Sequence, residues 1–295
     1  MHDIWNPWHG CKKCSEGCEN CYMYYLDEIH NNGDSSEVKL TSALTYPLSR
    51  LRDGSYRIKS GETLRVCLTS DFFIEEADDW REQAWEIMRM RPDVMFFLLT
   101  KRPQRVEKCL PRYWDGGQDN VMLSVTAENQ KRADERLPIL LSLPFARKGV
   151  MTAPLIDSVS LKDYLSDGQI EQVICGGENY GGARICRYDW VKTLYDECAS
   201  NNVTFCFIET GSRFLKDGKI YTIKSKRVQS KMAFLSGLQF KAKRPEYEFK
   251  DTLGMPIPEE NLYKPKFKPH CGTCGSRMIC NGCGFCAKCE MEKEL

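Results

Sequence analysis

The sequence of 295 residues has no run of eighteen apolar residues, and its first residues, Met-His-Asp-Ile-Trp, do not combine a basic region with a following apolar one. The first absence argues against a membrane-spanning helix, and the second argues against a secretory signal. We therefore expect a cytoplasmic protein with no membrane partner. Hydrophobic residues make up 42% of the chain, which is enough to build the core of one large domain or of a domain with an appendage.

An excess of charge of one sign is also absent from the chain as a whole. The formal net charge is +1, so the overall composition does not indicate a polyanionic partner. The stretch from Arg213 to Lys268 is different, because it carries more Lys and Arg than Asp and Glu. This local excess favours contact with a nucleotide or a nucleic acid.

Cysteine, by contrast, is abundant, with sixteen residues. In a cytosolic chain the thiol pool keeps cysteines reduced, which argues against a disulfide framework and leaves the thiolates available for metal. Four cysteines lie within residues 11–21 and six within residues 271–289. The other six stand singly in apolar stretches such as RVCLTS and TFCFIE, and we interpret them as small core residues.

A repeated alternation of strand-like and helix-like segments begins at residue 64. Short β-rich runs such as DVMFFLLTKRP and EQVICGGEN end in polar residues, and segments such as DDWREQAWEIMRMR place apolar residues on one helical face. This alternation predicts an α/β fold with a parallel sheet, either a doubly wound open sheet or a barrel. An open sheet concentrates its chemistry at one switch point, whereas here every run has a polar end. We therefore predict a partial (β/α) barrel of about six to seven parallel strands.

Three regions follow from these patterns. Residues 1–214 are predicted to form the partial barrel. Residues 215–268 break the alternation and are predicted to be a basic, irregular wrap or linker that includes KDGKIY as a hairpin. Residues 269–295 are a cysteine-rich tail that is too short to bury a core and would need metal to fold.

The opening cysteines, Cys11, Cys14, Cys18 and Cys21, form the motif C-x2-C-x3-C-x2-C. Three thiolates on one tight loop can hold three irons of a [4Fe–4S] cube and leave the fourth iron open. The amine and carboxylate of S-adenosylmethionine could bind that open iron. The alternative is a structural zinc site made by all four cysteines, although such sites usually have a long loop between two x2 knuckles, which is missing here.

The order of short motifs along the chain resembles one family. The motifs are WNPWHGC, GCENCY, TSDFF, LTKRP, ENQ, ADERLPILL, GGE, AR, DW and a final TG preceded by phenylalanine. Over about residues 4–225 they are similar to the phage gene-product thirty-seven/sixty-eight family, an uncharacterised group related to radical S-adenosylmethionine enzymes. The resemblance implies a partial barrel, a [4Fe–4S] cluster and S-adenosylmethionine as cofactor, but it implies no known substrate.

The third cluster ligand differs between two spacing patterns. The family spacing, C-x6-C-x2-C, selects Cys11, Cys18 and Cys21 and has an ordinary residue in place of Cys14. The general radical S-adenosylmethionine spacing, C-x3-C-x2-C, selects Cys14 instead of Cys11. Cys18 and Cys21 are ligands in both patterns. We favour Cys11 as the third, because the family frame NPWHGC around it is intact.

The polar residues that follow the predicted strands are candidates for binding the cofactor. Paired glycines allow a backbone to approach a ligand closely, carboxylates accept from an amine or a ribose hydroxyl, and Lys or Arg can pair with a carboxylate or a phosphate. The structural alternative is a plain turn or a salt bridge at the barrel rim. We predict that Asp71, Glu128 and Glu178 face one cavity at the mouth of the barrel. The full set of candidates is Ser70, Asp71, Lys101, Arg102, Ser124, Glu128, Asn129, Gly176, Gly177 and Glu178.

The tail carries a second set of closely spaced cysteines. Repeated x2 gaps suit an auxiliary iron–sulfur cube, whereas Cys-x2-Cys-Gly is also typical of a zinc knuckle that His270 could join. We predict a second metal site of one kind or the other. Its ligands would come from Cys271, Cys274, Cys280, Cys283, Cys286 and Cys289.

These observations lead to two functional hypotheses. In the first, the protein is a radical S-adenosylmethionine enzyme that uses an external electron donor and generates a 5′-deoxyadenosyl radical to abstract hydrogen from a substrate. The motifs do not identify that substrate, and the basic segment favours a nucleotide or a nucleic-acid base. In the second, the protein is a non-enzymatic zinc or iron–sulfur module that binds nucleic acid through residues 213–268 and the tail. The second hypothesis leaves the polar strand ends without a role.

Overall fold

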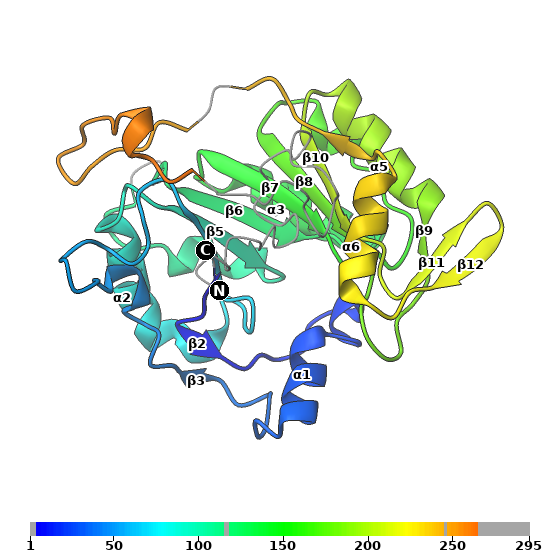
Figure 1. The fold of residues 1–295 in the computed structure, drawn as a ribbon, viewed down its shortest axis with the longest axis horizontal. Coiled ribbons are helices and arrows are strands. Elements are labelled where there is room, and N and C mark those ends of the chain that lie inside the picture. The colour runs from blue at the N-terminus through cyan, green and yellow to red at the C-terminus, as the bar shows by residue number, and fades with distance from the viewer. Residues whose placement is uncertain (1–3, 115–117, 245–246, 265–295) are drawn as a thin grey trace.

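The computed structural model describes residues 4–114, 118–244 and 247–264. Figure 1 shows a broad central sheet flanked by helices, with the N-terminal segment in blue and the last described segment in orange. The strands are β1 (Ile4–Trp5), β2 (Trp8–His9), β3 (Lys39–Leu40), β4 (Thr63–Val66), β5 (Met95–Thr100), β6 (Val121–Thr126), β7 (Arg147–Thr152), β8 (Ile170–Gly176), β9 (Cys186–Arg187), β10 (Thr204–Glu209), β11 (Arg213–Lys216), β12 (Lys219–Thr222) and β13 (Gln239–Phe240). The helices are α1 (Tyr22–His30), α2 (Asp78–Arg89), α3 (Gln130–Ser142), α4 (Lys162–Leu165), α5 (Tyr188–Ser200) and α6 (Lys226–Leu235).

The largest sheet has eight strands in the order β1-β4-β5-β6-β7-β8-β10-β13. All neighbours from β1 to β10 run parallel, and β13 pairs antiparallel with β10. The predicted α/β fold with a parallel sheet is therefore confirmed. The strands follow one another in chain order across the sheet, so successive connections move in one direction. Within the described residues the sheet is open, with β1 and β13 as its two edges.

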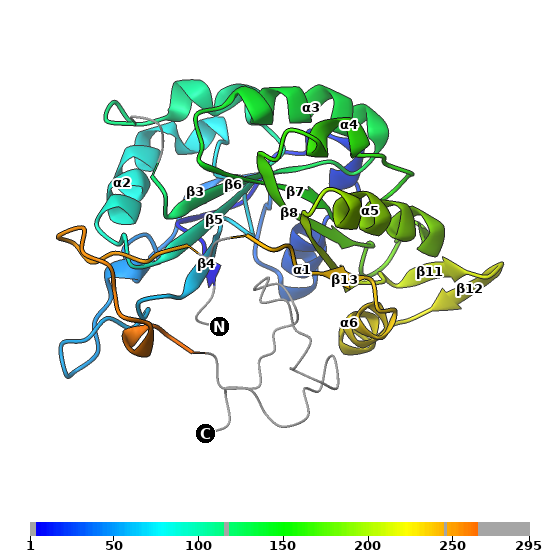
Figure 2. The same cartoon turned by 90° about the horizontal axis from the view of Figure 1, so that it is seen from above.

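One face of the sheet is covered by helices. Figure 2 shows α2, α3, α4 and α5 on this side. Alternate strand residues such as Leu123 and Val125 point toward the helices and share a buried cluster with Trp85, Leu137 and Leu194. This cluster is the main hydrophobic core, because both the period of two in the strands and the period of 3.6 in the helices direct apolar side chains into it. None of the helices in the described ranges is long and apolar enough to cross a membrane.

The opposite face of the sheet carries a second, smaller apolar cluster. It contains one or two residues from each of the central strands, which alternate with the residues that face the helices. Its buried members are Met95, Phe97, Met122, Met151, Ile174 and Cys206. Both faces of the central strands are therefore apolar, which accounts for the nearly continuous hydrophobic runs in their sequences.

The region after β10 is more regular than its sequence suggested. The expected hairpin is present as the antiparallel pair β11 and β12, and β11 also pairs with β9. Residues 226–235 form α6 instead of an irregular wrap, because buried Ala233 and Phe234 pack this helix against β10. Residues 247–264 then run past the amino ends of β6 and β4, where Lys250 pairs with Asp119 and the Tyr263 backbone N–H donates to Ser60 O at 2.7 Å.

Candidate functional site

Residues 10–21, which we call the cysteine loop, connect β2 to α1. Cys18 ends a short 3-10 helix, η1 (Glu16–Cys18), and Cys21 immediately precedes α1. Cys18 is buried, Cys11 and Cys21 are half-buried, and Cys14 is exposed. All four thiols are free. The loop therefore presents four cysteines on a short stretch of chain, with the third of them sheltered from solvent.

The start of the loop is fastened to the segment that follows β4. The Gly10 backbone N–H donates to Thr69 O at 3.1 Å, and the Ser70 hydroxyl donates to Gly10 O at 2.5 Å. The Cys11 backbone N–H donates to Ser35 O at 2.9 Å. Ser70, a predicted cofactor ligand, thus holds the backbone that carries the first cysteine.

Asp71, directly after Ser70, is buried and accepts four hydrogen bonds. Its Oδ1 accepts from the Phe73 backbone N–H at 2.9 Å and from the Thr100 hydroxyl at 2.8 Å. Its Oδ2 accepts from the Lys101 backbone N–H at 3.0 Å and from Arg102 Nη1 at 3.0 Å. These bonds occupy the carboxylate, and they join the end of β4 to the end of β5.

Arg102 connects this carboxylate to the cysteine loop. Its Nη2 donates to Lys12 O at 2.6 Å, and its Nη1 lies 3.9 Å from Cys11 Sγ. Burial and the nearby Asp71 carboxylate nevertheless raise the pKa of Cys11 to about 11, against the opposing effect of Arg102. Without metal, Cys11 is therefore a protonated thiol at neutral pH.

Glu128 supports the middle of the loop from the end of β6. Its fully buried carboxylate accepts from Arg136 Nη1 at 2.7 Å and from the Ser15 hydroxyl. Gly17 packs directly on this side chain, since a Cβ at Gly17 would lie 2.8 Å from Glu128 Cγ. The loop can seat at this depth only because residue 17 has no side chain.

We expect Gly17→Ala to lower the free energy of unfolding by about 1–3 kcal/mol, because the added methyl group overlaps a buried carboxylate that its two partners hold in place. Gly181→Ala is the matched control, since a Cβ there has no atom within 4 Å, and it should change stability by less than about 0.5 kcal/mol. Urea denaturation of both variants measures the difference. Equal stability of the two variants would show that the loop does not rest on Glu128.

Glu178 supports the end of the loop from the segment after β8. Its Oε2 accepts from Asn20 Nδ2 at 3.1 Å and from the Arg184 backbone N–H at 2.7 Å. The Arg184 guanidinium pairs with the same carboxylate and also reaches Glu16 O at 2.9 Å and Glu19 Oε2 at 3.1 Å. Its bonds to Arg184 and Asn20 outweigh burial and lower the pKa of Glu178, so this carboxylate is ionised at neutral pH.

The glycines before Glu178 serve strand packing. A Cβ at Gly177 would lie 2.4 Å from Thr210 O, and one at Gly176 would lie 3.2 Å from Glu209 Cγ. The chain after β8 therefore approaches the chain after β10 more closely than a side chain would allow. Packing within the protein therefore accounts for the presence of glycine at both positions.

Two further candidates have different surroundings. The Asn129 side chain caps α3, where Oδ1 accepts from the Arg132 backbone N–H at 2.9 Å. Ser124 lies inside β6 and is 1% exposed. Its hydroxyl and that of Thr126, two residues along the same strand, are buried and have no protein partner in the described part of the chain. The hydrogen-bonding capacity of these two hydroxyls is therefore unused, whereas the Asn129 side-chain oxygen is engaged.

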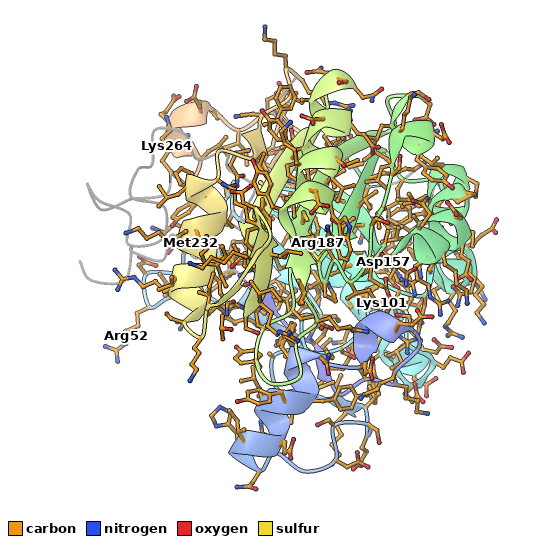
Figure 3. The ribbon with its side chains drawn as sticks, turned by 90° about the vertical axis from the view of Figure 1, so that its right-hand side faces the viewer. Arg52, Lys101, Asp157, Arg187, Met232 and Lys264 are labelled. Carbon is orange, nitrogen blue, oxygen red and sulfur yellow. The ribbon has the colours of Figure 1, made fainter. Side chains whose placement is uncertain are left out.

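Positive charge faces the thiols of the loop. Figure 3 shows Lys101 next to the blue N-terminal segment. Burial opposes its charge, but Cys18 and Glu128 outweigh this and raise the pKa of Lys101, with smaller contributions from Cys21 and Cys14. A hydrogen bond with Cys14, together with Lys101, lowers the pKa of Cys18, and the same hydrogen bond raises the pKa of Cys14. Of this pair, Cys18 therefore has the lower pKa.

The sequence analysis missed the residues that connect the loop to the strand ends. These are Ser15 and Asn20 within the loop, Arg136 on α3, and Arg184 after β8. Arg184 belongs to the AR motif quoted above and follows a pair of glycines. This position was the sequence feature that could have indicated a role for Arg184. Arg136 sits in a helix at a position that sequence patterns assign to an exposed face, yet its side chain is only 5% exposed.

The donor set of the loop fits a thiolate-bound iron–sulfur cluster. Lys101 interacts electrostatically with Cys18, Cys21 and Cys14, and Arg102 with Cys14 and Cys11, so these two cations would balance a negatively charged cluster. In the described ranges no three Cys, His, Asp or Glu side chains are already gathered in a metal-binding arrangement. The predicted second metal site lies outside the described residues, with Cys271, Cys274, Cys280, Cys283, Cys286 and Cys289.

The fold and the site define an α/β protein in which a cysteine-rich loop is seated on the carboxyl ends of parallel strands. The chain belongs to the family described as a protein of unknown function, DUF5131, which matches residues 1–243. The matched residues contain the cysteine loop and every strand of the large sheet in the described ranges. No curated protein and no solved structure matches the chain.

Proposed function

We propose that this protein is a radical S-adenosylmethionine enzyme whose cysteine loop holds a [4Fe–4S] cluster. The observation that carries the proposal is the position of this loop. Four cysteines lie over the carboxyl ends of a parallel sheet, where α/β proteins place their active sites, and two cations face their thiols. Cys18 and Cys21 would be two of the three ligands, and Cys11 or Cys14 would be the third.

Cys18, Cys21 and the third cysteine would hold a cluster that supplies one electron, taken from an external donor, for cleavage of the carbon–sulfur bond of S-adenosylmethionine; this cleavage would give methionine and a 5′-deoxyadenosyl radical that takes hydrogen from the substrate. The protein's own residues have three tasks. The side chains that hydrogen-bond to the cysteine loop would hold the thiols in place. Lys101 and Arg102 would balance negative charge, and the packed strand ends would exclude water from the buried side of the loop.

The strand-end carboxylates act as loop anchors in this proposal. Asp71, Glu128 and Glu178 each follow the carboxyl end of a parallel strand, and their oxygens bind protein donors; that they face one cavity stays a prediction. They would position the cysteines and would not bind the cofactor directly. The free hydroxyls of Ser124 and Thr126 are better candidates for contact with the ribose or the methionine carboxylate, because their hydrogen-bonding capacity is unused.

The proposal extends to the architecture and the cellular context. The run of parallel strands in chain order, with helices on one face, would be a partial (β/α) barrel that the cysteine loop closes at one end. A reduced, cluster-bearing loop requires the reducing environment of the cytoplasm and an external electron donor.

The test is anaerobic reconstitution with iron and sulfide, followed by reduction and addition of S-adenosylmethionine. We expect about four irons per N-terminal cluster and formation of 5′-deoxyadenosine that depends on the reductant. The Cys18→Ala variant is the control and should form none. Full iron loading without 5′-deoxyadenosine would contradict the enzymatic proposal. Zinc in place of iron would favour the alternative, a non-enzymatic metal module that binds nucleic acid.

A further inference from the structure

Residues 213–244, which we call the basic arm, contain β11, β12, α6 and β13. The arm has ten Lys and Arg residues and one acidic residue, a formal charge of +9. Because the whole chain has a net charge of +1, the remainder carries 1 − 9 = −8. The neutral composition of the chain therefore conceals two parts of opposite sign, and the positive part is a single continuous segment.

The hairpin, α6 and the link between them carry most of this charge and lie on one side of the molecule. Figure 1 shows the hairpin and α6 at the same side, in yellow, and Figure 3 views that side with Met232 marking α6. Six cations of the hairpin, the helix and the link between them are exposed. They are Arg213, Lys219, Lys224, Lys226, Arg227 and Lys231. A polyanion could contact several of them at once.

The same surface also exposes large apolar side chains. Val228, Met232 and Leu235 lie along one stripe of α6 and are 43%, 46% and 58% exposed. Ile220 and Tyr221 on β12 are 48% and 42% exposed. Exposed cations alone would need no partner, because water solvates them. Exposed apolar side chains placed between the cations indicate a surface that contacts another molecule.

The arm adjoins the cysteine loop. Lys226 Nζ, at the start of α6, lies 3.4 Å from Glu209 Oε2 and 5.9 Å from the centre of the Tyr22 ring. Tyr22 directly follows Cys21. A second aromatic pair, Tyr25 and Tyr180, stacks at 4.7 Å between α1 and the segment after β8. A nucleic-acid strand bound along the arm could therefore extend to the cysteine loop, where the proposed reaction takes place.

We propose that the basic arm binds single-stranded nucleic acid and presents it to the cysteine loop. Phosphates would pair with the exposed Lys and Arg side chains, and unstacked bases would contact Tyr221 and the apolar stripe of α6. In a duplex the bases stay stacked and paired, so a duplex would contact the Lys and Arg side chains through its phosphates but would not place its bases on Tyr221 or α6. This inference deepens the proposed function by naming the class of substrate, whereas binding itself requires neither cluster nor cofactor.

The experiment compares the full chain with two charge-reversal variants by fluorescence anisotropy, using a labelled mixed-sequence DNA strand of about twenty nucleotides. The arm variant carries Lys219→Glu, Lys224→Glu, Arg227→Glu and Lys231→Glu. The control variant reverses four exposed lysines on other elements, Lys59, Lys108, Lys131 and Lys162. Circular dichroism checks that both variants are folded.

We expect the arm variant to bind the oligonucleotide at least about tenfold more weakly than the unaltered protein does. The slope of log K against log salt should be smaller in magnitude by about 2.8, or about 0.7 for each lost phosphate contact. The control variant should bind more tightly than the arm variant by the same factor. Equal binding by the two variants would overturn the inference, and so would tighter binding to phosphatidylserine vesicles than to the oligonucleotide. Because 5′-deoxyadenosine is measured without nucleic acid, failure of the proposed function would be seen separately.

Discussion

Replacing Cys18 or Cys21 by alanine should remove about four irons per chain, the broad visible absorbance of the N-terminal cluster, and all formation of 5′-deoxyadenosine. Both residues are ligands in either spacing pattern, and a cube that loses one of three thiolates is no longer held. Cys18 is also buried, and the nearby charge of Lys101 contributes to lowering its pKa. Iron analysis and absorbance of the reconstituted full chain measure the effect.

Cys109→Ala is the control for loss of a thiol, because Cys109 is half-buried and lies outside the loop. It should retain the iron of the unaltered protein. Cys11→Ala and Cys14→Ala then identify the third ligand, since only one of them should behave like Cys18→Ala. Unchanged iron content in both the Cys18 and Cys21 variants would contradict a cluster in this loop.

Arg136→Met should lower the free energy of unfolding by about 3–5 kcal/mol, because it leaves the buried carboxylate of Glu128 without the guanidinium that hydrogen-bonds to it. The side chains of Arg136 and Glu128 are 5% and 0% exposed, and their charged atoms lie 2.7 Å apart. Arg136 also donates to Thr126 O at 2.6 Å. Urea denaturation of the metal-free protein measures the change.

Arg132→Met, four residues earlier on the same helix, is the matched control. Arg132 pairs with Glu16 at 2.8 Å and with Glu135 at 2.6 Å, but both carboxylates are exposed, so its loss should cost about 1 kcal/mol or less. The double variant Arg136→Met with Glu128→Gln should recover part of the lost stability, because the buried charge is then absent. A loss in Arg136→Met no larger than in Arg132→Met would show that Glu128 does not need its partner.

Several features of the fold follow from local sequence patterns. Apolar runs of four to seven residues alternating with amphipathic segments predicted the parallel sheet, and KDGKIY predicted the hairpin of β11 and β12. The segment of α6 was not predicted to be helical, because its stabilising contacts come from β10, which is distant in the sequence. The partners of the site residues were missed for the same reason.

The sequence by itself determined the α/β class and the spacing of the four cysteines. It also determined that Asp71, Glu128 and Glu178 lie at the carboxyl ends of the strands, because parallel strands bring these ends to one side of the sheet. Only the tertiary structure decided what these carboxylates bind. The Asn20 side chain meets Glu178 across a separation of 158 residues, and Ser15 meets Glu128 across 113. Hydrogen bonds over such separations depend on how strands, loop and helices pack together, and no local pattern specifies them.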